Sequence, residues 1–521
     1  MDFSMLLRRA VRNHSENVAV WCDGESQSYE QLWERSCRLA NGLRDLGVEP
    51  GDRVTLFGDN CLQTVEQVAG VALGNFVRSG LYTHATPESN AYLLELIDAR
   101  ALIVQRKHLE RLAGVFGDLE NSVRVIVYDG DAPNGTVAYE DLLAHASPSD
   151  PEVVVAAEDD HIIRFSAGTA GKPKGIVHTV AGWMGVGNEL AVTLPRLDED
   201  DCYLAAGPLT HAATLLLWPT LQAGGEIVVM PAFDPARALD LIEQRRVTFT
   251  QLVPTMIQIL VNHPGVAERD LSSLRFIPYG ASPISERTLV DAIAVWGNIM
   301  FQVYGQSECV PVTALSPLHH RPEGDEHERR WLRSAGRPTP NSTVTILDEN
   351  AAPLPPGEIG EIAINSPGRM KGIWRDPEAT AARLLSDGSV LSRDMGYIDE
   401  DGFLFLADRK EDMIISGGFN IWPAELENAL ASHPAVLEAC VVGVPHPKWG
   451  ETPVGVVVLR EGRQADEQEL IAWTAEKVGS VKKVTAVKFA SELPKTPIGK
   501  ILRREVRRLH WTAAESRVAG A

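Results

Sequence analysis

Cysteine is scarce in this sequence, and long apolar runs are missing from it. The 521 residues include six cysteines, which are widely scattered and contain no CxxC pair. This spacing excludes a four-cysteine zinc site or a dithiol redox centre and favours reduced, buried thiols. No run of eighteen apolar residues occurs, and the first sixteen residues lack the apolar core of a signal peptide. We therefore expect a cytoplasmic protein with no membrane partner.

Positive charge is also in short supply. Lysine and arginine number 49 against 70 aspartates and glutamates, which gives a net charge of -21. Such a balance disfavours nucleic acid as a partner, so an anionic ligand has to be held locally by loops and a metal. The length predicts two or more domains, and the content of 44% apolar and 23% charged residues is typical of globular proteins.

The most informative stretch is RFSAGTAGKPKG, residues 164–175, which follows an apolar run at 161–165. Its three glycines allow successive backbone amides to converge on an anion, and its hydroxyls and two lysines add donors and charge. This composition predicts a polyphosphate-binding loop, with a flexible surface loop as the plainer alternative. The glycine spacing fits neither a Walker loop nor GxGxxG.

Strand-like runs alternate with helical segments through the first half of the chain. A capping box at Ser28 and Gln31 opens a helix that ends at Gly47, and another helix is expected at 62–73. Strands are expected at 53–58, 101–105, 123–128, 161–165, 202–206, 226–230, 249–253 and 275–280. This alternation predicts an α/β fold, with mostly parallel sheets covered by helices.

The texture changes toward the C-terminus. Short strands and turns from Thr343 onward predict an antiparallel β region. Beyond Arg409, helices at 423–432 and 467–478 and strands at 439–444, 454–459 and 486–489 predict a separate α+β unit. We therefore predict a large N-terminal domain, 1–407, and a small mobile C-terminal domain, 408–521.

Five further motifs follow the loop. They are GASPIS (280–285), FQVYGQSE (301–308), SRDMGYID (392–399), DRKEDMIISGGFNIWPAELE (408–427) and PKTPIGK (494–500). With these motifs the chain resembles, over nearly its whole length, the adenylate-forming superfamily of acyl-CoA synthetases, luciferases and peptide-synthetase adenylation domains. It is most similar to the acyl- and aryl-CoA ligases. The resemblance implies an ATP-dependent acid:CoA ligase that uses ATP, Mg²⁺ and coenzyme A.

The resemblance also implies an ATP site. Tyr304 would cover the adenine, Asp394 would accept the ribose hydroxyls, and Thr169 with Glu308 would place Mg²⁺. The residues implied to bind the nucleotide are Ser166, Gly168, Thr169, Gly171, Lys172, Lys174, Gly280, Ala281, Ser282, Tyr304, Gly305, Ser307, Asp394 and Arg409.

Further roles follow from the same resemblance. Lys500 would bridge the substrate carboxylate and the α-phosphate, and Glu411 would be the hinge of a domain rotation. His211 would stand beside the acyl pocket and the entering thiol, unless it is a core histidine. The coenzyme A contacts implied are the tunnel residues Ser416, Gly417 and Gly418 and the stacking residue Trp449, which could instead be an ordinary half-buried tryptophan.

Several positions depart from the family pattern or stay unassigned. Ala167 and Ala170 replace hydroxyl residues of the loop, Ser307 replaces a threonine, and Ser392 with Arg393 replaces Thr-Gly. Four histidines lack ligand spacing and are predicted to lie at the surface: His319, His320, His433 and His446.

The identity of the acid is the least readable feature. Small residues at 212, 213, 280, 281 and 305, with the apolar Trp183, Trp218 and Val310 nearby, predict a pocket for a bulky hydrophobic acid: fatty, aryl or polycyclic. Alternatives are an acyl-AMP ligase that loads a carrier protein, a luciferase-like oxidoreductase and a non-catalytic nucleotide-binding regulator. The sequence leaves a homodimer open.

Overall fold

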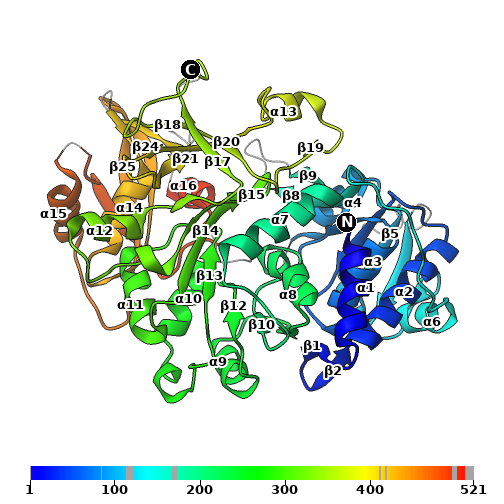
Figure 1. Cartoon of the computed structure of the whole chain (residues 1–521). Coiled ribbons are helices and arrows are strands. Elements are labelled where there is room, and N and C mark those ends of the chain that lie inside the picture. The colour runs from blue at the N-terminus through cyan, green and yellow to red at the C-terminus, as the bar shows by residue number, and fades with distance from the viewer. Residues whose placement is uncertain are drawn as a thin grey trace.

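The computed structural model describes residues 2–83, 85–112, 123–166, 173–409, 412–416, 419–480, 482–495 and 501–510. It leaves out the side chains of Ser166, Asp408, Arg409, Asn420 and His510. In this part of the chain the strands form five sheets, with helices packed around them (Figure 1).

The largest sheet has eight strands, and six of them are parallel neighbours from β8 to β7. Their order is β19 (Gly372–Ile373), β9 (Lys174–Thr179), β8 (Asp160–Ser166), β4 (Val77–Gly80), β3 (Arg53–Phe57), β5 (Ala101–Gln105), β6 (Arg124–Tyr128) and β7 (Val137–Ala138). The predicted parallel character is confirmed. β9 runs antiparallel to β8, so the glycine-rich stretch joins the two strands of a hairpin.

A second sheet is parallel except for its edge strand β2. Its order is β12 (Phe249–Thr250), β10 (Cys202–Ala205), β11 (Glu226–Val229), β1 (Val18–Cys22) and β2 (Glu25–Ser28). The helix α3 (Leu62–Leu73) lies between the two large sheets, because it contacts β4 of one and β1 of the other. Its sequence is apolar nearly all round, and every residue except Gln63 is buried, as expected for a helix enclosed on both sides.

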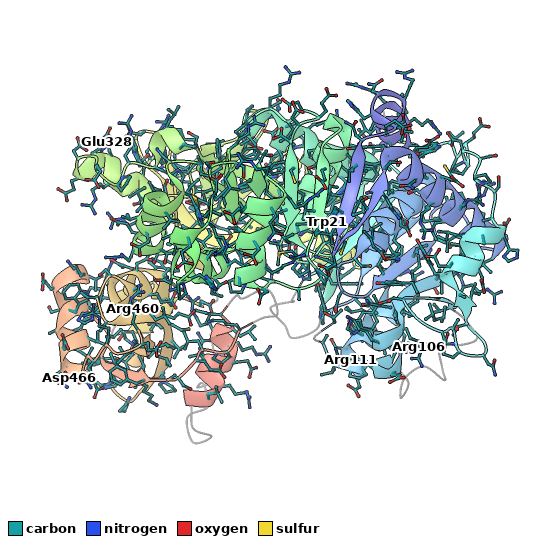
Figure 2. All side chains as sticks on the ribbon, turned by 90° about the horizontal axis from the view of Figure 1, so that it is seen from below. Trp21, Arg106, Arg111, Glu328, Arg460 and Asp466 are labelled. Atoms are coloured by element: carbon teal, nitrogen blue, oxygen red, sulfur yellow. The ribbon has the colours of Figure 1, made fainter. Side chains whose placement is uncertain are left out.

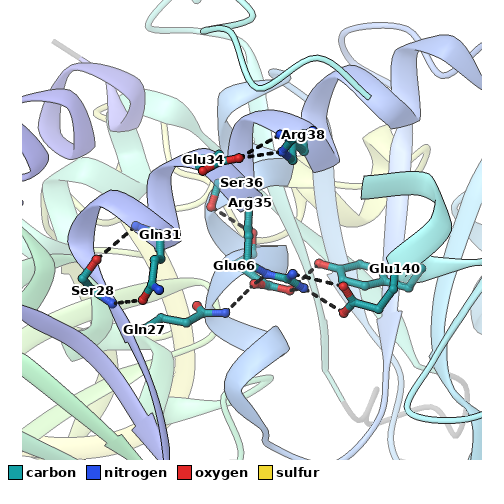
Figure 3. A network of polar contacts seen from close by, with 10 residues as sticks. Gln27, Ser28, Gln31, Glu34, Arg35, Ser36, Arg38, Glu66 and Glu140 are labelled. Carbon is teal, nitrogen blue, oxygen red and sulfur yellow. Dashed lines mark hydrogen bonds and ion pairs between the residues drawn. The ribbon is translucent and has the colours of Figure 1, made fainter. Parts of the chain in front are cut away.

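Glu66 places a carboxylate in the middle of this buried helix. Its side chain is fully buried and accepts hydrogen bonds from Arg35 Nη2, Gln27 Nε2 and the Tyr139 hydroxyl, each at 2.9 Å (Figure 3). The same arginine donates to Glu140 Oε1 at 2.8 Å. These bonds join α2 (Tyr29–Asp45), α3 and α6 (Tyr139–His145), and α2 begins at the predicted capping box.

Two smaller sheets complete the N-terminal part. The first contains β13 (Ile277–Gly280), β14 (Met300–Gln306), β15 (Cys309–Leu315) and β16 (Arg337–Pro338). The second is the predicted antiparallel region and contains β17 (Thr343–Leu347), β18 (Gly360–Asn365), β20 (Val390–Ile398) and β21 (Leu404–Arg409). The other helices here are α1 (Phe3–His14), α4 (Pro87–Leu96), α5 (Arg106–Leu109), α7 (Val180–Thr193), α8 (Leu217–Ala223), α9 (Pro235–Gln244), α10 (Pro254–Val261), α11 (Glu286–Trp296), α12 (Glu326–Arg330) and α13 (Pro377–Ala381).

The C-terminal part has a sheet of its own. It contains β22 (Ile414–Ser416), β23 (Phe419–Ile421), β24 (Val436–His446), β25 (Gly450–Leu459) and β26 (Ala486–Phe489), with α14 (Pro423–Ala431), α15 (Glu467–Val478) and α16 (Arg503–His510). Arg460 and Asp466 mark this part in Figure 2, at the opposite end of the molecule from Arg106 and Arg111. Gln258 Nε2 of the N-terminal part donates to the carbonyl of Leu437 at 3.1 Å. No helix in the described ranges has the length and apolarity of a membrane span.

Candidate active site

Tyr304, Gln306 and Asp394 form a hydrogen-bonded group that joins two sheets. The first two residues come from β14, and Asp394 comes from β20. The Tyr304 hydroxyl donates to Asp394 Oδ2 at 2.8 Å, and Gln306 Nε2 donates to the same oxygen at 2.6 Å. Gln306 Nε2 also donates to the carbonyl of Ser392 at 2.9 Å. The carboxylate predicted to bind the ribose is therefore fixed beside the ring predicted to cover the adenine.

The segment Gly280–Ser282 begins at the end of β13, which pairs with β14. Gly280 lies opposite Val303, and a Cβ at Gly280 would stand 2.2 Å from the Val303 carbonyl oxygen, which leaves no room for a larger residue. Ala281 has a φ of +67°, a left-handed conformation that costs a non-glycine residue roughly 1–2 kcal/mol. Strain of this kind gathers at ligand-binding segments.

Ser307 and Glu308 form the turn between β14 and β15. The Ser307 carbonyl accepts a hydrogen bond from His178 Nε2 at 2.7 Å, and Glu308 Oε1 lies 3.1 Å from Arg383 Nη1. Carboxylate oxygens are ligands that Mg²⁺ prefers, so Glu308 fits the predicted metal role. Its predicted partner Thr169 lies outside the described residues, among which no cluster of three or more metal-binding side chains occurs.

His211 lies in the wall of a small cavity between β4, β8 and the segment 209–211. Its Nδ1 is 2.9 Å from the Thr210 hydroxyl, and its ring centroid is 4.9 Å from that of Tyr82. Burial, and then the charge of Arg164, lower the pKa of His211 to about 4. The imidazole is therefore neutral near pH 7 and is a poor base for a thiol, whose pKa is about 8.5.

Ser416 and Trp449, two of the residues predicted to contact coenzyme A, lie close to each other. Ser416 of β22 pairs with Gly450 of β25, the neighbour of Trp449. Trp449 is 41% exposed and stacks on His446, with ring centroids 4.3 Å apart and an interplanar angle of 14°. One face of the indole is therefore taken by an imidazole, and the pair forms a flat aromatic surface of the kind on which nucleobases stack.

Much of the predicted phosphate loop falls outside the described residues. Lys174, at the start of β9, lies opposite Ser166 at the end of β8, and its Nζ is 3.1 Å from Asp376 Oδ2. The side chains of Ser166 and Arg409 are not described. The other predicted site residues outside the description are Gly168, Thr169, Gly171, Lys172, Glu411, Gly417, Gly418 and Lys500.

Residues 7–374 match the model of the AMP-binding enzyme family, and residues 425–500 match that of the AMP-binding enzyme C-terminal domain. The chain belongs to the AMP-binding enzyme family. It is 37% identical to a feruloyl-CoA synthase of an Amycolatopsis species, over 96% of this chain and 97% of that protein. It is 34% identical to a medium/long-chain fatty acid–CoA ligase of Mycobacterium tuberculosis, over 98% and 90%. The solved structure of an amide bond synthetase from Marinactinospora thermotolerans superposes with a TM-score of 0.88 at 30% identity, covering 98% of this chain and 100% of that one.

Two histidines of this AMP-binding enzyme that were predicted at the surface are buried, so that prediction was wrong. His320 is 1% exposed, with its Nε2 2.9 Å from the Tyr279 hydroxyl, and burial lowers its pKa to about 4. His433 is 7% exposed and packs edge-on against Trp473. In both cases an aromatic side chain from a distant element covers the ring, and the local sequence gives no sign of that contact.

The two tryptophans expected near the acyl pocket are also deeply buried. Trp218 packs against Phe3 of α1, with ring centroids 4.6 Å apart. Trp183 of α7 lies under the guanidinium of Arg164, whose Cζ is 5.5 Å from the ring centroid. Trp218 therefore serves the packing of α1 on α8, whereas Trp183 supports a charged side chain.

Three supporting residues of this AMP-binding enzyme were not singled out from the sequence: Gln306, Arg383 and His178. Gln306 could have been found, since alternate residues of a strand share a face and it stands two positions after Tyr304. Arg383 and His178 carried no local signal, because both meet the turn at Glu308 only through the tertiary fold.

Proposed function

We propose that this enzyme is an ATP-dependent acid:CoA ligase that activates a hydrophobic carboxylic acid as acyl-AMP and then transfers the acyl group to the coenzyme A thiol. The observation that carries the proposal is the hydrogen-bonded group formed by Tyr304, Gln306 and Asp394. Glu308 lies in the turn that follows Gln306 at the end of β14. The carboxylates of Asp394 and Glu308 supply oxygen acceptors for a ribose and a metal, and they lie near the flat ring of Tyr304. Relatives named as fatty acid and feruloyl CoA ligases support a thioester product.

In the first half-reaction the substrate carboxylate attacks the α-phosphorus, the bond to the β-phosphate breaks, and pyrophosphate leaves. Asp394 accepts from the ribose hydroxyls while Tyr304 covers the adenine. Glu308 and Thr169 would hold Mg²⁺, which neutralises phosphate charge when it is bound. Lys500 lowers the repulsion between the carboxylate and the α-phosphate and stabilises the charge that develops there.

In the second half-reaction the thiolate attacks the acyl carbonyl carbon and AMP leaves. Ser416, Gly417 and Gly418 would line the path of the thiol arm, and Trp449 would stack on the adenine of coenzyme A. His211 serves as a neutral wall of the pocket, because its lowered pKa makes it a weak base and a thiol is already partly ionised near neutral pH.

The two half-reactions would be separated by a rotation of the C-terminal domain, 408–521, on the N-terminal domain, 1–407, about a hinge at Glu411. The chain supports this division. β21 ends at Arg409 in one sheet and β22 begins at Ile414 in another. A crossing between separate sheets is where relative movement of two packed units is expected.

The cellular setting belongs to the same proposal. Six free cysteines in the chain fit the reducing cytoplasm, where ATP and coenzyme A are available. A homodimer stays a prediction, and light scattering of the purified enzyme tests it by measuring the molecular mass in solution.

A panel of fatty, aryl and polycyclic acids tests the function. Acid-dependent pyrophosphate release followed by an acyl-CoA product is the expected result, measured by a coupled assay and by mass spectrometry. Nucleotide binding without pyrophosphate release for any acid would favour a non-catalytic regulator. Acyl-AMP formation with transfer only to a carrier protein would favour the carrier-loading alternative, and light emission or consumption of oxygen would favour the luciferase-like one.

A further inference from the structure

Two arginines face one small cavity inside the N-terminal part of the chain. The cavity has a volume of about 50 Å³ and lies between β4, β8 and the segment 209–211. Arg78 of β4 and Arg164 of β8 both line it. No aspartate or glutamate of the described residues lines the cavity. The remaining polar side chains of its wall are neutral near pH 7, and they are Thr64, Ser79, Tyr82, Thr210, His211 and Ser307.

Neither guanidinium forms an ion pair within the described part of the chain. Arg78 is 4% exposed; its Nη2 is 3.4 Å from the Thr214 hydroxyl, and its Nε has no hydrogen-bond partner there. Arg164 rests on the ring of Trp183. The carboxylate whose charge acts on Arg164 is Glu308, and that group is already paired with Arg383 at 3.1 Å.

Two like charges held away from water are unfavourable unless an anion joins them. Burial, and then the charge of Arg164, lower the pKa of Arg78 to about 10, and burial also lowers the pKa of Arg164. Both side chains nevertheless stay charged near pH 7. An unpaired buried charge is strongly destabilising, whereas a guanidinium with a bound carboxylate forms short, charge-assisted hydrogen bonds.

We propose that this cavity is an anion-binding subsite that receives a carboxylate-sized group, namely a second acidic group carried by the substrate acid. The volume suits a carboxylate with a few waters, since one water needs about 10–15 Å³ of such space. The cavity shares His211 and Ser307 with the candidate active site, so a group bound there lies next to that site. This inference rests on the proposed acid:CoA ligation, and a small anion from solution has the same chemistry.

Matched acids test the source of the anion. Pyrophosphate release is measured with monocarboxylic acids from butanoic to decanoic acid and with the dicarboxylic acids of the same lengths. For the wild type we expect kcat/KM to favour the best diacid over its matched monoacid about tenfold or more. Arg78→Met and Arg164→Met should each abolish this preference, and Arg78→Met should leave the KM for ATP unchanged. Arg237→Met, at a partly exposed position on α9, is the control and should retain the preference.

Thermal unfolding tests the site without catalysis. At constant ionic strength, replacing gluconate by chloride or acetate should raise the Tm of the wild type. Arg164→Met should lose this response and, without added anion, should melt above the wild type, because an unpaired and partly buried charge is gone. Arg164→Lys keeps the charge and should keep the response, which provides the readout if Arg164→Met does not fold.

The outcomes separate the two ideas. A response to free anions without a diacid preference would support the subsite with solution as its source. No anion response together with no diacid preference would overturn it, and so would an Arg164→Met variant in which only the KM for ATP rises. If no tested acid causes pyrophosphate release but the anion response persists, the proposed ligase is refuted and the anion site is supported.

Discussion

Replacing Tyr304 with phenylalanine would separate the ring of the nucleotide site from its hydroxyl group. The ring is 8% exposed and should keep its place, whereas the 2.8 Å hydrogen bond to Asp394 is lost. A hydrogen bond to a charged group contributes about 1.5–3 kcal/mol. Because Gln306 still donates to the same oxygen at 2.6 Å, we take the lower limit, which corresponds to about tenfold weaker ATP binding.

Acid-dependent exchange between ATP and labelled pyrophosphate measures this effect. The KM for ATP should rise about tenfold while kcat changes little, since the ribose contact is made in the ground state and the transition state alike. Replacing Gln306 with methionine as well should cost more than the two single changes together, because Asp394 then loses both donors. Tyr397→Phe is the matched control on β20, the strand of Asp394, where the ring stacks on Phe405. A folded Tyr304→Phe enzyme with an unchanged KM for ATP would refute the reasoning.

Three further predictions concern catalysis, stability and pH. Lys500→Ala should abolish acyl-AMP formation but largely spare thioester formation from supplied acyl-AMP, and equal loss of both half-reactions would contradict the assigned role. Arg35→Met leaves the buried Glu66 uncompensated and should lower the free energy of unfolding by about 3–5 kcal/mol in denaturant titrations. Arg287→Met, which breaks a surface pair of the exposed Arg287 with Asp291, should cost less than about 1 kcal/mol. Similar losses in both variants would argue against the buried network. Burial lowers the pKa of three histidines from 6.5 to about 4: His178, His211 and His320. Because the unfolded chain binds protons at these histidines first, the free energy of unfolding should be fully present above pH 6.5 and should fall toward pH 4 by about 1.4 kcal/mol per pH unit for each of them. A flat pH profile of the unfolding free energy would exclude the effect.

Several secondary-structure elements could be predicted because their signals are local. The helix Glu467–Val478 matches its prediction, since Asp466 and Glu469 form a capping box and Gly479 has a positive φ. The strand Ala101–Gln105 also matches. Other strands changed length: the one predicted at 249–253 is confined to Phe249–Thr250, and the one predicted at 439–444 extends over Val436–His446. Strand ends depend on how far the neighbouring strand runs, which a single segment does not encode.

The candidate site divides in the same way. Motif residues such as Tyr304, Asp394 and Glu308 could be named as candidates from the sequence, because each occurs in a short motif that resembles those of the adenylate-forming superfamily. The partners that orient them, Gln306 and Arg383, and the pair Arg78 and Arg164 around the cavity, required the fold. Arg78 and Arg164 come from β4 and β8, neighbouring parallel strands whose sequences are far apart.

By itself, the sequence determined the alternation of strands and helices and the family, and it named the side chains predicted to bind the nucleotide, because each depends on short-range periodicity or on spacing within a motif. Only the tertiary structure decided which groups meet in space. It placed the hydroxyl of Tyr304 on Asp394, enclosed His320 and His433 against distant aromatic rings, and left two arginines facing one cavity. Burial and long-range packing set those contacts, and both arise only when segments far apart in the chain come together.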